Sequence, residues 1–233
     1  MAAPKKDTKD SSAEVKAELE KTRKALAEAL EQIEKLKEKE TGKPAVQPKE
    51  KTIKDGHEYV DLGLPSGLKW ATCNVGASKP EDFGNYYAWG ETSTKTEYME
   101  DNSKTYGKSM LDIAGNSNYD AARANWGGTW RMPTKSEMQE LINKCNWEWT
   151  THNGVKGYKV TGPNGNSIFL PAAGIRLGSS VDDAGSFGSY WSSTPNEDIT
   201  DEAYYVLPFN SDEYCMDYCY YSNVGGSVRP VLE

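Results

Sequence analysis

The residues of this sequence best suited to chemistry are two cysteines near the C-terminus, Cys215 and Cys219, spaced as Cys-x3-Cys. Redox and zinc motifs use a two-residue spacing, and only His57 and His152 could add imidazole ligands. Acidic neighbours raise the pKa of a thiol and disfavour the thiolate that copper binding or nucleophilic attack requires. The paired acids Asp182-Asp183 fit loop solvation or a calcium ligand better than acid/base catalysis. We therefore predict no enzymatic activity and no cofactor, with a structural calcium ion left open.

The same end of the chain has the composition of a binding surface. The motifs Tyr190-Trp191-Ser192-Ser193 and Gly226-Ser227-Val228-Arg229-Pro230 enclose a tract with six tyrosines among Asp, Glu, Asn and Ser, and no Lys or Arg occurs from Leu177 through Val228. Tyrosine offers rigid amphipathic contact area, while Ser, Asn and Asp offer adaptable hydrogen bonds. The alternative is a tyrosine-rich, half-exposed β-meander, because tyrosine favours strands.

We expect the ligand contacts to come from polar or amphipathic residues of this tract: Asn196, Glu197, Asp198, Asp212, Tyr214, Cys215, Asp217, Tyr218, Tyr220, Tyr221 and Ser222. Apolar residues between them should pack inward and hold the backbone while the other side chains change, as a rigid scaffold does for binding loops. These inward positions are Trp191, Ala203, Leu207, Phe209 and Val228.

The charge of the chain is unevenly distributed. Residues 1–55 carry 14 Lys/Arg and 12 Asp/Glu, whereas residues 56–233 carry 13 and 23. An acidic domain is a poor partner for nucleic acids and for anionic membrane surfaces, so we expect neither. No apolar run approaches the roughly 20 residues of a membrane span, and the first residues lack the apolar core of a secretory signal.

The N-terminal segment predicts a stalk. Apolar or small residues recur at steps of four and three from Val15 to Leu36, with Leu19, Leu26 and Ile33 at one heptad position. We predict a disordered stretch over 1–11, a coiled-coil helix over 12–41 and an extended linker over 42–56. A helix of this length is marginal alone, so we expect a homo-oligomer, and a trimer by analogy with phage adhesins. The alternative is a solvated single helix.

Residues 57–233 predict an α+β head with few helices. Alternation and Gly/Pro punctuation predict a hairpin from residues 57–62 and 68–75, and Gly162-Pro-Asn-Gly165 predicts a second one. Residues 76–128 lack periodicity and predict packed loops, with a helical turn near residues 119–126. Thr134 and Glu137 have capping-box spacing and predict the start of a helix.

Four motifs in order carry a family resemblance: Trp130-Arg-Met-Pro-Thr-Lys-Ser-Glu-Met138, Ile168-Phe-Leu-Pro-Ala-Ala-Gly174, Tyr190-Trp-Ser-Ser193 and Gly226-Ser-Val-Arg-Pro230. They resemble the formylglycine-generating-enzyme branch of the C-type lectin-like superfamily. The segment from Tyr59 to Ala71 is similar to paralogous surface and phage proteins of gut anaerobes. The resemblance covers the head and implies a C-type lectin-like fold. Formylglycine-generating enzymes use two C-terminal cysteines that bind copper, with a spacing one residue longer than in this chain, so a divergent oxidase is one alternative.

Some proteins of this fold are the variable proteins of diversity-generating retroelements, in which copying errors at adenines rewrite a C-terminal tract. The run of Tyr, Cys, Asp, Ser and Asn over residues 214–223 is similar to such tracts, which places the variable region at about residues 189–231. The resemblance implies a multivalent adhesin, on a phage tail fibre or a cell surface, that binds a protein or glycan receptor of a target cell. A fixed-sequence surface or appendage structural protein is the other alternative.

Overall fold

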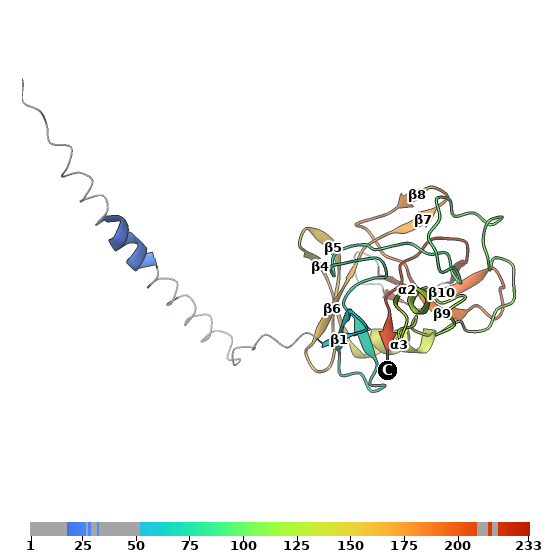
Figure 1. The fold of residues 1–233 in the computed structure, drawn as a ribbon, viewed down its shortest axis with the longest axis horizontal. Helices are drawn as coiled ribbons and strands as arrows, with labels where there is room; N and C mark the ends of the chain where they lie inside the picture. Colours follow the sequence, from blue (N-terminus) through green and yellow to red (C-terminus); the bar gives the residue numbers. More distant parts are fainter. Residues whose placement is uncertain (1–17, 27, 29–31, 33–51, 209–213, 216–218) are drawn as a thin grey trace, which may run out of the picture. The chain divides into compact units, whose positions relative to one another are not determined.

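A computed structural model describes residues 18–26, 28, 32, 52–208, 214–215 and 219–233 (Figure 1). The chain divides into two units, Met1–Glu50 and Lys51–Glu233. In the first unit, residues 18–26 are helical, and Leu19 and Leu26 are 53% and 61% exposed. Most of the expected coiled coil over 12–41 lies outside the described residues, so the stalk remains a prediction.

The second unit begins with a four-stranded sheet in the order β1-β2-β3-β13, made of β1 (Thr52–Lys54), β2 (His57–Asp61), β3 (Lys69–Ala71) and β13 (Val231–Leu232). The antiparallel pairing of β2 with β3 confirms the first predicted hairpin. The predicted linker over 42–56 is too long, because β1 already pairs with β2. Asp55 and Gly56 have φ of 48° and 83°, the left-handed conformation that a tight two-residue hairpin turn requires.

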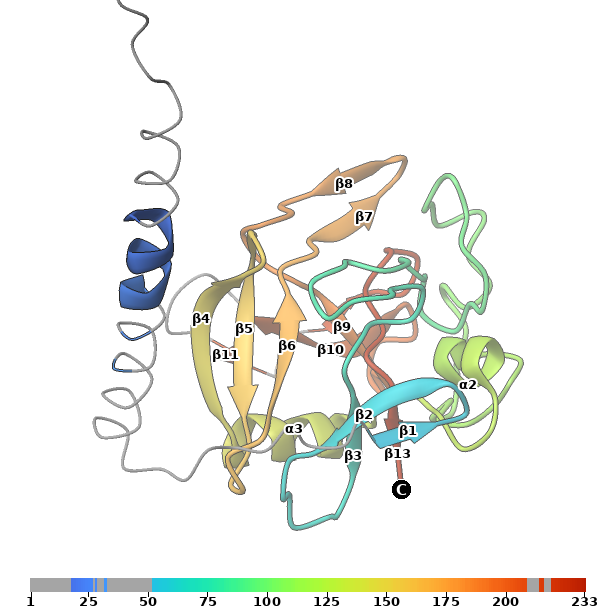
Figure 2. The ribbon, with the colours of Figure 1, turned by 60° about the vertical axis from the view of Figure 1, so that its left-hand side comes forward.

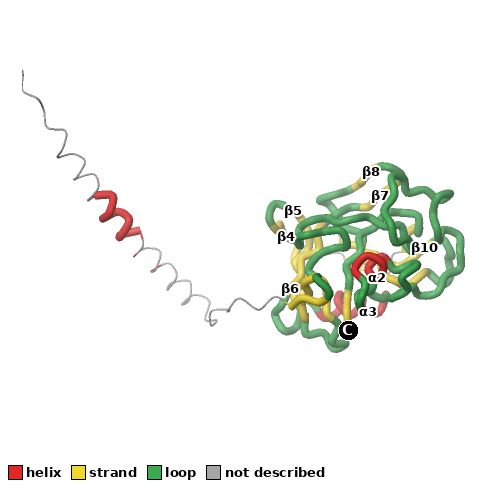
Figure 3. The backbone as a smooth tube through the Cα atoms, viewed as in Figure 1, coloured by secondary structure: helices red, strands yellow, loops and turns green. Residues whose placement is uncertain are grey.

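Two short helices follow, α2 (Ala121–Trp126) and α3 (Lys135–Lys144). The capping box of α3 is confirmed: the Thr134 hydroxyl accepts from the Glu137 amide at 3.3 Å, and the Glu137 carboxylate accepts from the Thr134 amide at 2.8 Å. The apolar face of α3 buries Met138 and Leu141. Elsewhere residues 76–128 are mostly loops and turns, as predicted (Figure 3).

The middle of the chain forms a three-stranded antiparallel sheet of β4 (Asn146–His152), β5 (Val155–Thr161) and β6 (Ser167–Pro171). The second predicted hairpin is confirmed, since a turn over residues 162–166 joins β5 to β6 and the Gly165 amide donates to the Gly162 carbonyl at 2.9 Å. One face of this sheet packs against α3, since Tyr158 and Val160 share a hydrophobic cluster with Met138 and Leu141.

The C-terminal third contributes two more antiparallel sheets (Figure 2). One joins β9, β10, β11 and β12, and the other pairs β7 with β8. Their bounds are β7 (Ile175–Leu177), β8 (Ser180–Asp182), β9 (Tyr190–Pro195), β10 (Glu202–Pro208), β11 (Tyr214–Cys215) and β12 (Cys219–Tyr221). The described chain therefore has few helices and many antiparallel strands in small sheets, in agreement with the α+β class.

Strand β9 lies between the two large hydrophobic clusters of the head. Tyr190 belongs to the cluster that contains Trp70 and Leu170, whereas Trp191 belongs to the cluster that contains Trp89. Successive side chains of a strand point to opposite faces, which explains how one strand serves both clusters. A change in the position of β9 therefore affects both of these clusters.

Arg229 is a buried cation that ties together distant parts of the chain. It is fully buried, and its guanidinium donates to the carbonyls of Ala71, Thr72 and Phe169 and to the side chain of Asn74, at 2.9 to 3.0 Å. Burial lowers the pKa of Arg229 from its usual value. The planar fork of arginine satisfies several acceptors at once, which a lysine in this position could not do.

Candidate binding face

The two ends of the tyrosine-rich tract are fixed side by side. The Trp191 amide donates to the Ser227 carbonyl at 3.0 Å, and the Ser227 amide donates to the Ser189 carbonyl at 2.7 Å. Trp191 is buried, and its indole donates to the Tyr87 carbonyl at 2.9 Å. The predicted inward packing is confirmed for Trp191, Ala203 and Val228. The side chains of Leu207 and Phe209 lie outside the described part of the structure.

Strand β12 presents its tyrosines in two different ways. It pairs with β10, so that Tyr220 lies opposite Ala203 and Tyr221 opposite Glu202. Tyr220 is half-buried against the cluster that contains Trp191, whereas Tyr221 is 48% exposed. Of these two predicted contact residues, Tyr221 is the more exposed and offers about half of its surface to a partner.

Ser222 does not belong to the exposed face, so its prediction as a contact residue is wrong. It is buried, its amide donates to the Asp201 carbonyl at 2.7 Å, and its carbonyl accepts from the Trp89 amide at 2.8 Å. The chain turns inward after β12, so both backbone groups of this residue serve the interior. The sequence does not indicate this turn, because Ser222 is a polar residue among other polar residues.

The turn between β9 and β10 carries the acidic contact residues. Glu197 and Asp198 are exposed, while Asn196 is half-buried. The Asn196 side chain accepts from the Asp198 amide at 3.1 Å and donates to the Glu202 carboxylate at 3.1 Å, so it holds the turn in place. Because Glu202 pairs with Tyr221, the turn lies close to the exposed tyrosine.

The other predicted contact residues cannot be located in detail. Tyr214 and Cys215 form β11, and their side chains lie outside the description; Asp212, Asp217 and Tyr218 are outside the described residues altogether. The side chain of Cys219 lies outside the description as well, so the expectation of no metal or redox site at Cys215 and Cys219 stays a prediction. Among the residues that the structure does describe, no group of three or more His, Cys, Asp or Glu is placed to hold a metal ion.

Two residues from other parts of the chain lie beside tyrosines of the tract. The ring of Tyr106, in the long loop region, lies 6.2 Å from that of Tyr221. Desolvation, together with the nearby carboxylates of Glu100 and Asp201, raises the pKa of Tyr106 to about 12. The Lys135 ammonium, at the start of α3, lies 3.4 Å from the centroid of the Tyr204 ring.

Sequence patterns did not indicate either residue. Tyr106 and Lys135 are far from the tract in the chain, and neither stands in a motif that points to it. The fold thus brings the ring of Tyr106 and the ammonium group of Lys135 to a tract that has no cation of its own. We name Tyr106, Glu197, Asp198, Tyr204 and Tyr221 the acidic tyrosine face.

Comparison with known proteins adds no assignment. No protein-family model, curated protein or solved structure matches the chain. A search for a bilayer-spanning helix over the described residues finds none with the required length and apolar character.

Proposed function

We propose that this protein is a multivalent ligand-binding adhesin whose receptor contacts the acidic tyrosine face. The observation that carries the proposal is the contrast between a buried, hydrogen-bonded frame and an exposed surface of tyrosines and carboxylates. Trp191, Ala203 and Val228 are buried, while Tyr221, Glu197 and Asp198 between them are exposed. Rigid elements that display variable polar and aromatic side chains are the general design of binding surfaces.

The head is proposed to have a C-type lectin-like fold, and its tract to be diversified by a retroelement. The order of the four motifs along the chain supports the proposed fold. The position of the tract between two hydrogen-bonded ends supports the proposed diversification. The partner is a protein or glycan receptor on a target cell, and it is cationic or rich in hydroxyls. The adhesin itself is carried on a phage tail or on a cell surface. The decisive test is genomic: a near-identical downstream copy of the region coding for residues 189–231 should differ only at adenines. A gene without such a copy contradicts diversification but not binding.

Association through the N-terminal helix is the second part of the proposal. Leu19 and Leu26 are seven residues apart and therefore lie on one side of the helix, where both are exposed in the single chain. We expect the full chain to sediment as a homo-oligomer, with a trimer as first choice. Replacing both leucines by aspartate should give a monomer, because it removes two apolar contacts per chain and adds like charges at the seam.

The control for this experiment is Lys21→Asp with Lys24→Asp, a pair of changes at exposed helical positions off the seam. This variant changes charge on the same helix and should remain an oligomer. A monomeric wild-type chain at tens of micromolar, or an unchanged sedimentation coefficient for the leucine variant, would remove the stalk from the proposal.

A further inference from the structure

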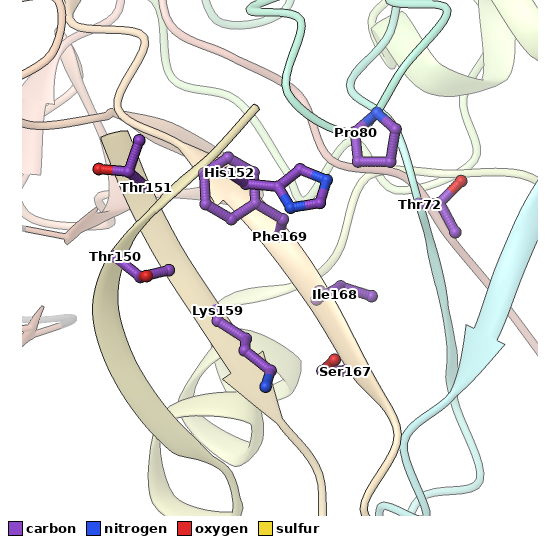
Figure 4. A pocket seen from close by; sticks show the side chains of 9 residues that line it. All are labelled: Thr72, Pro80, Thr150, Thr151, His152, Lys159, Ser167, Ile168 and Phe169. Carbon is purple, nitrogen blue, oxygen red and sulfur yellow. The ribbon is translucent and has the colours of Figure 1, made fainter. Parts of the chain in front are cut away.

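A second concave site lies on the sheet of β4, β5 and β6, apart from the acidic tyrosine face. It has a cavity volume of about 370 Å³, within the range of sites for small molecules. Its lining comes from the three strands and from the loops that contain Thr72 and Pro80 (Figure 4). None of its lining residues belongs to the tyrosine-rich tract.

One end of this cavity carries aromatic rings. The His152 and Phe169 rings lie 5.2 Å apart, and the half-exposed His152 side chain forms part of the wall. The position of Phe169 depends on Gly157 of the neighbouring strand, since a Cβ at that glycine would lie 2.7 Å from the tip of the phenyl ring. Flat apolar surface of this kind suits the C–H face of a sugar ring.

The other end carries a free cation. Lys159 is exposed, lies on the cavity side of β5 near Ser167, and has no hydrogen-bond or ion-pair partner among the described residues (Figure 4). Its cross-strand neighbour Glu148 forms no ion pair with it in the described part of the chain. An ammonium group without a partner beside a cavity is suited to a carboxylate of a ligand.

The charged side chains at the two ends of the cavity favour one orientation of a bound ligand. Behind His152, Glu81 accepts from the Asn153 side chain at 2.9 Å, and its second carboxylate oxygen lies 3.9 Å from the His152 ring. The aromatic end is therefore close to the Glu81 carboxylate, whereas Lys159, opposite Glu148 on β4, supplies the cation at the other end. Thr150 and Ser167 also line the cavity and offer hydroxyl groups without side-chain hydrogen bonds to described residues.

From this geometry we propose that the cavity binds a hydroxylated carboxylic acid of monosaccharide size, such as a uronic acid unit of an acidic glycan. The carboxylate pairs with Lys159, the hydroxyls bond to Thr150 and Ser167, and the ring lies against His152 and Phe169. The site lies outside the tyrosine-rich tract and does not depend on the acidic tyrosine face. It would give the head a fixed, weak glycan contact in addition to its receptor contacts.

Saturation-transfer NMR on the full chain tests this proposal with glucuronate as the probe. Glucuronate should bind in the millimolar range, whereas glucose, which lacks the carboxylate, and acetate, which lacks the ring, should bind much more weakly. Lys159→Gln should lower the affinity for glucuronate about tenfold or more, because a charge-assisted hydrogen bond is lost. The matched control is Lys156→Gln, an exposed lysine of the same strand that does not line the cavity.

Equal binding of glucuronate by the two lysine variants would overturn the proposal, as would the absence of glucuronate binding by the wild-type chain. Acetate binding as tight as that of glucuronate would also overturn it, because the site would then be a bare anion site. Melting curves of both variants establish that the fold is intact, and we expect no change, since both side chains are exposed.

Discussion

Tyr221→Ala is expected to weaken attachment to the native receptor roughly thirtyfold, which corresponds to about 2 kcal/mol. The Tyr221 ring is 48% exposed and lies beside the ring of Tyr106 and close to the acidic turn, so it can serve as a central anchor of the interface. The melting temperature should change little, because an exposed ring contributes little to the core. Titration of purified receptor or target cells against both proteins measures the effect.

Tyr220→Ala is the contrasting variant. Tyr220 packs against the cluster that contains Trp191, so its truncation should lower the melting temperature. For this reason the combined truncation of Tyr218, Tyr220 and Tyr221, which the sequence alone would suggest as a neutral change for stability, is a poor test. Ile53→Ala, an exposed apolar position on β1, is the matched control and should bind as the wild type does. Unchanged binding by Tyr221→Ala would place the receptor contacts elsewhere.

Trp191→Ala is expected to have the opposite outcome and to destabilise the head by about 3–5 kcal/mol. The ring is buried, its indole donates to the Tyr87 carbonyl, and it lies directly over Gly226, where an added Cβ would be 2.6 Å from the indole nitrogen. A domain has only about 5–15 kcal/mol of stability, so the variant should be partly unfolded near body temperature. Urea denaturation followed by tryptophan fluorescence measures the loss.

Trp191→Phe provides the control for this experiment, because it keeps most of the buried area and loses mainly the indole hydrogen bond. Its free energy of unfolding should lie between that of the wild type and that of the alanine variant. If Trp191→Ala melts as the wild type does, β9 does not have the central role described above.

Local signals predicted the local structure well. The Thr134 capping box and the turn after Thr161 are formed by neighbouring residues, and both were confirmed. The hairpin at Asp55 and Gly56 is also local, yet the Lys- and Pro-rich composition before it favoured a linker. In that stretch β1 is exposed, so no alternating pattern marked it as a strand.

The binding face was less predictable because it depends on contacts between distant segments. Tyr106 reaches Tyr221 only through the folding of a long loop region, and Lys135 reaches Tyr204 only because α3 packs near β10. Ser222 was assigned to the surface because it is polar, whereas backbone hydrogen bonds draw it inside. Amino-acid type indicates the preference of a side chain, but the path of the backbone decides its exposure.

The pairing of Ser189 and Trp191 with Ser227 has a consequence for the length of the chain between them. These hydrogen bonds close a loop whose ends meet regardless of what lies between. The entropy of closing a flexible loop depends weakly on its length, with each doubling costing only about 0.6 kcal/mol. Insertions and deletions in the exposed turn between β9 and β10 should therefore be tolerated almost as readily as substitutions. Evolution of this protein could then change the length of this turn as well as the side chains that it presents.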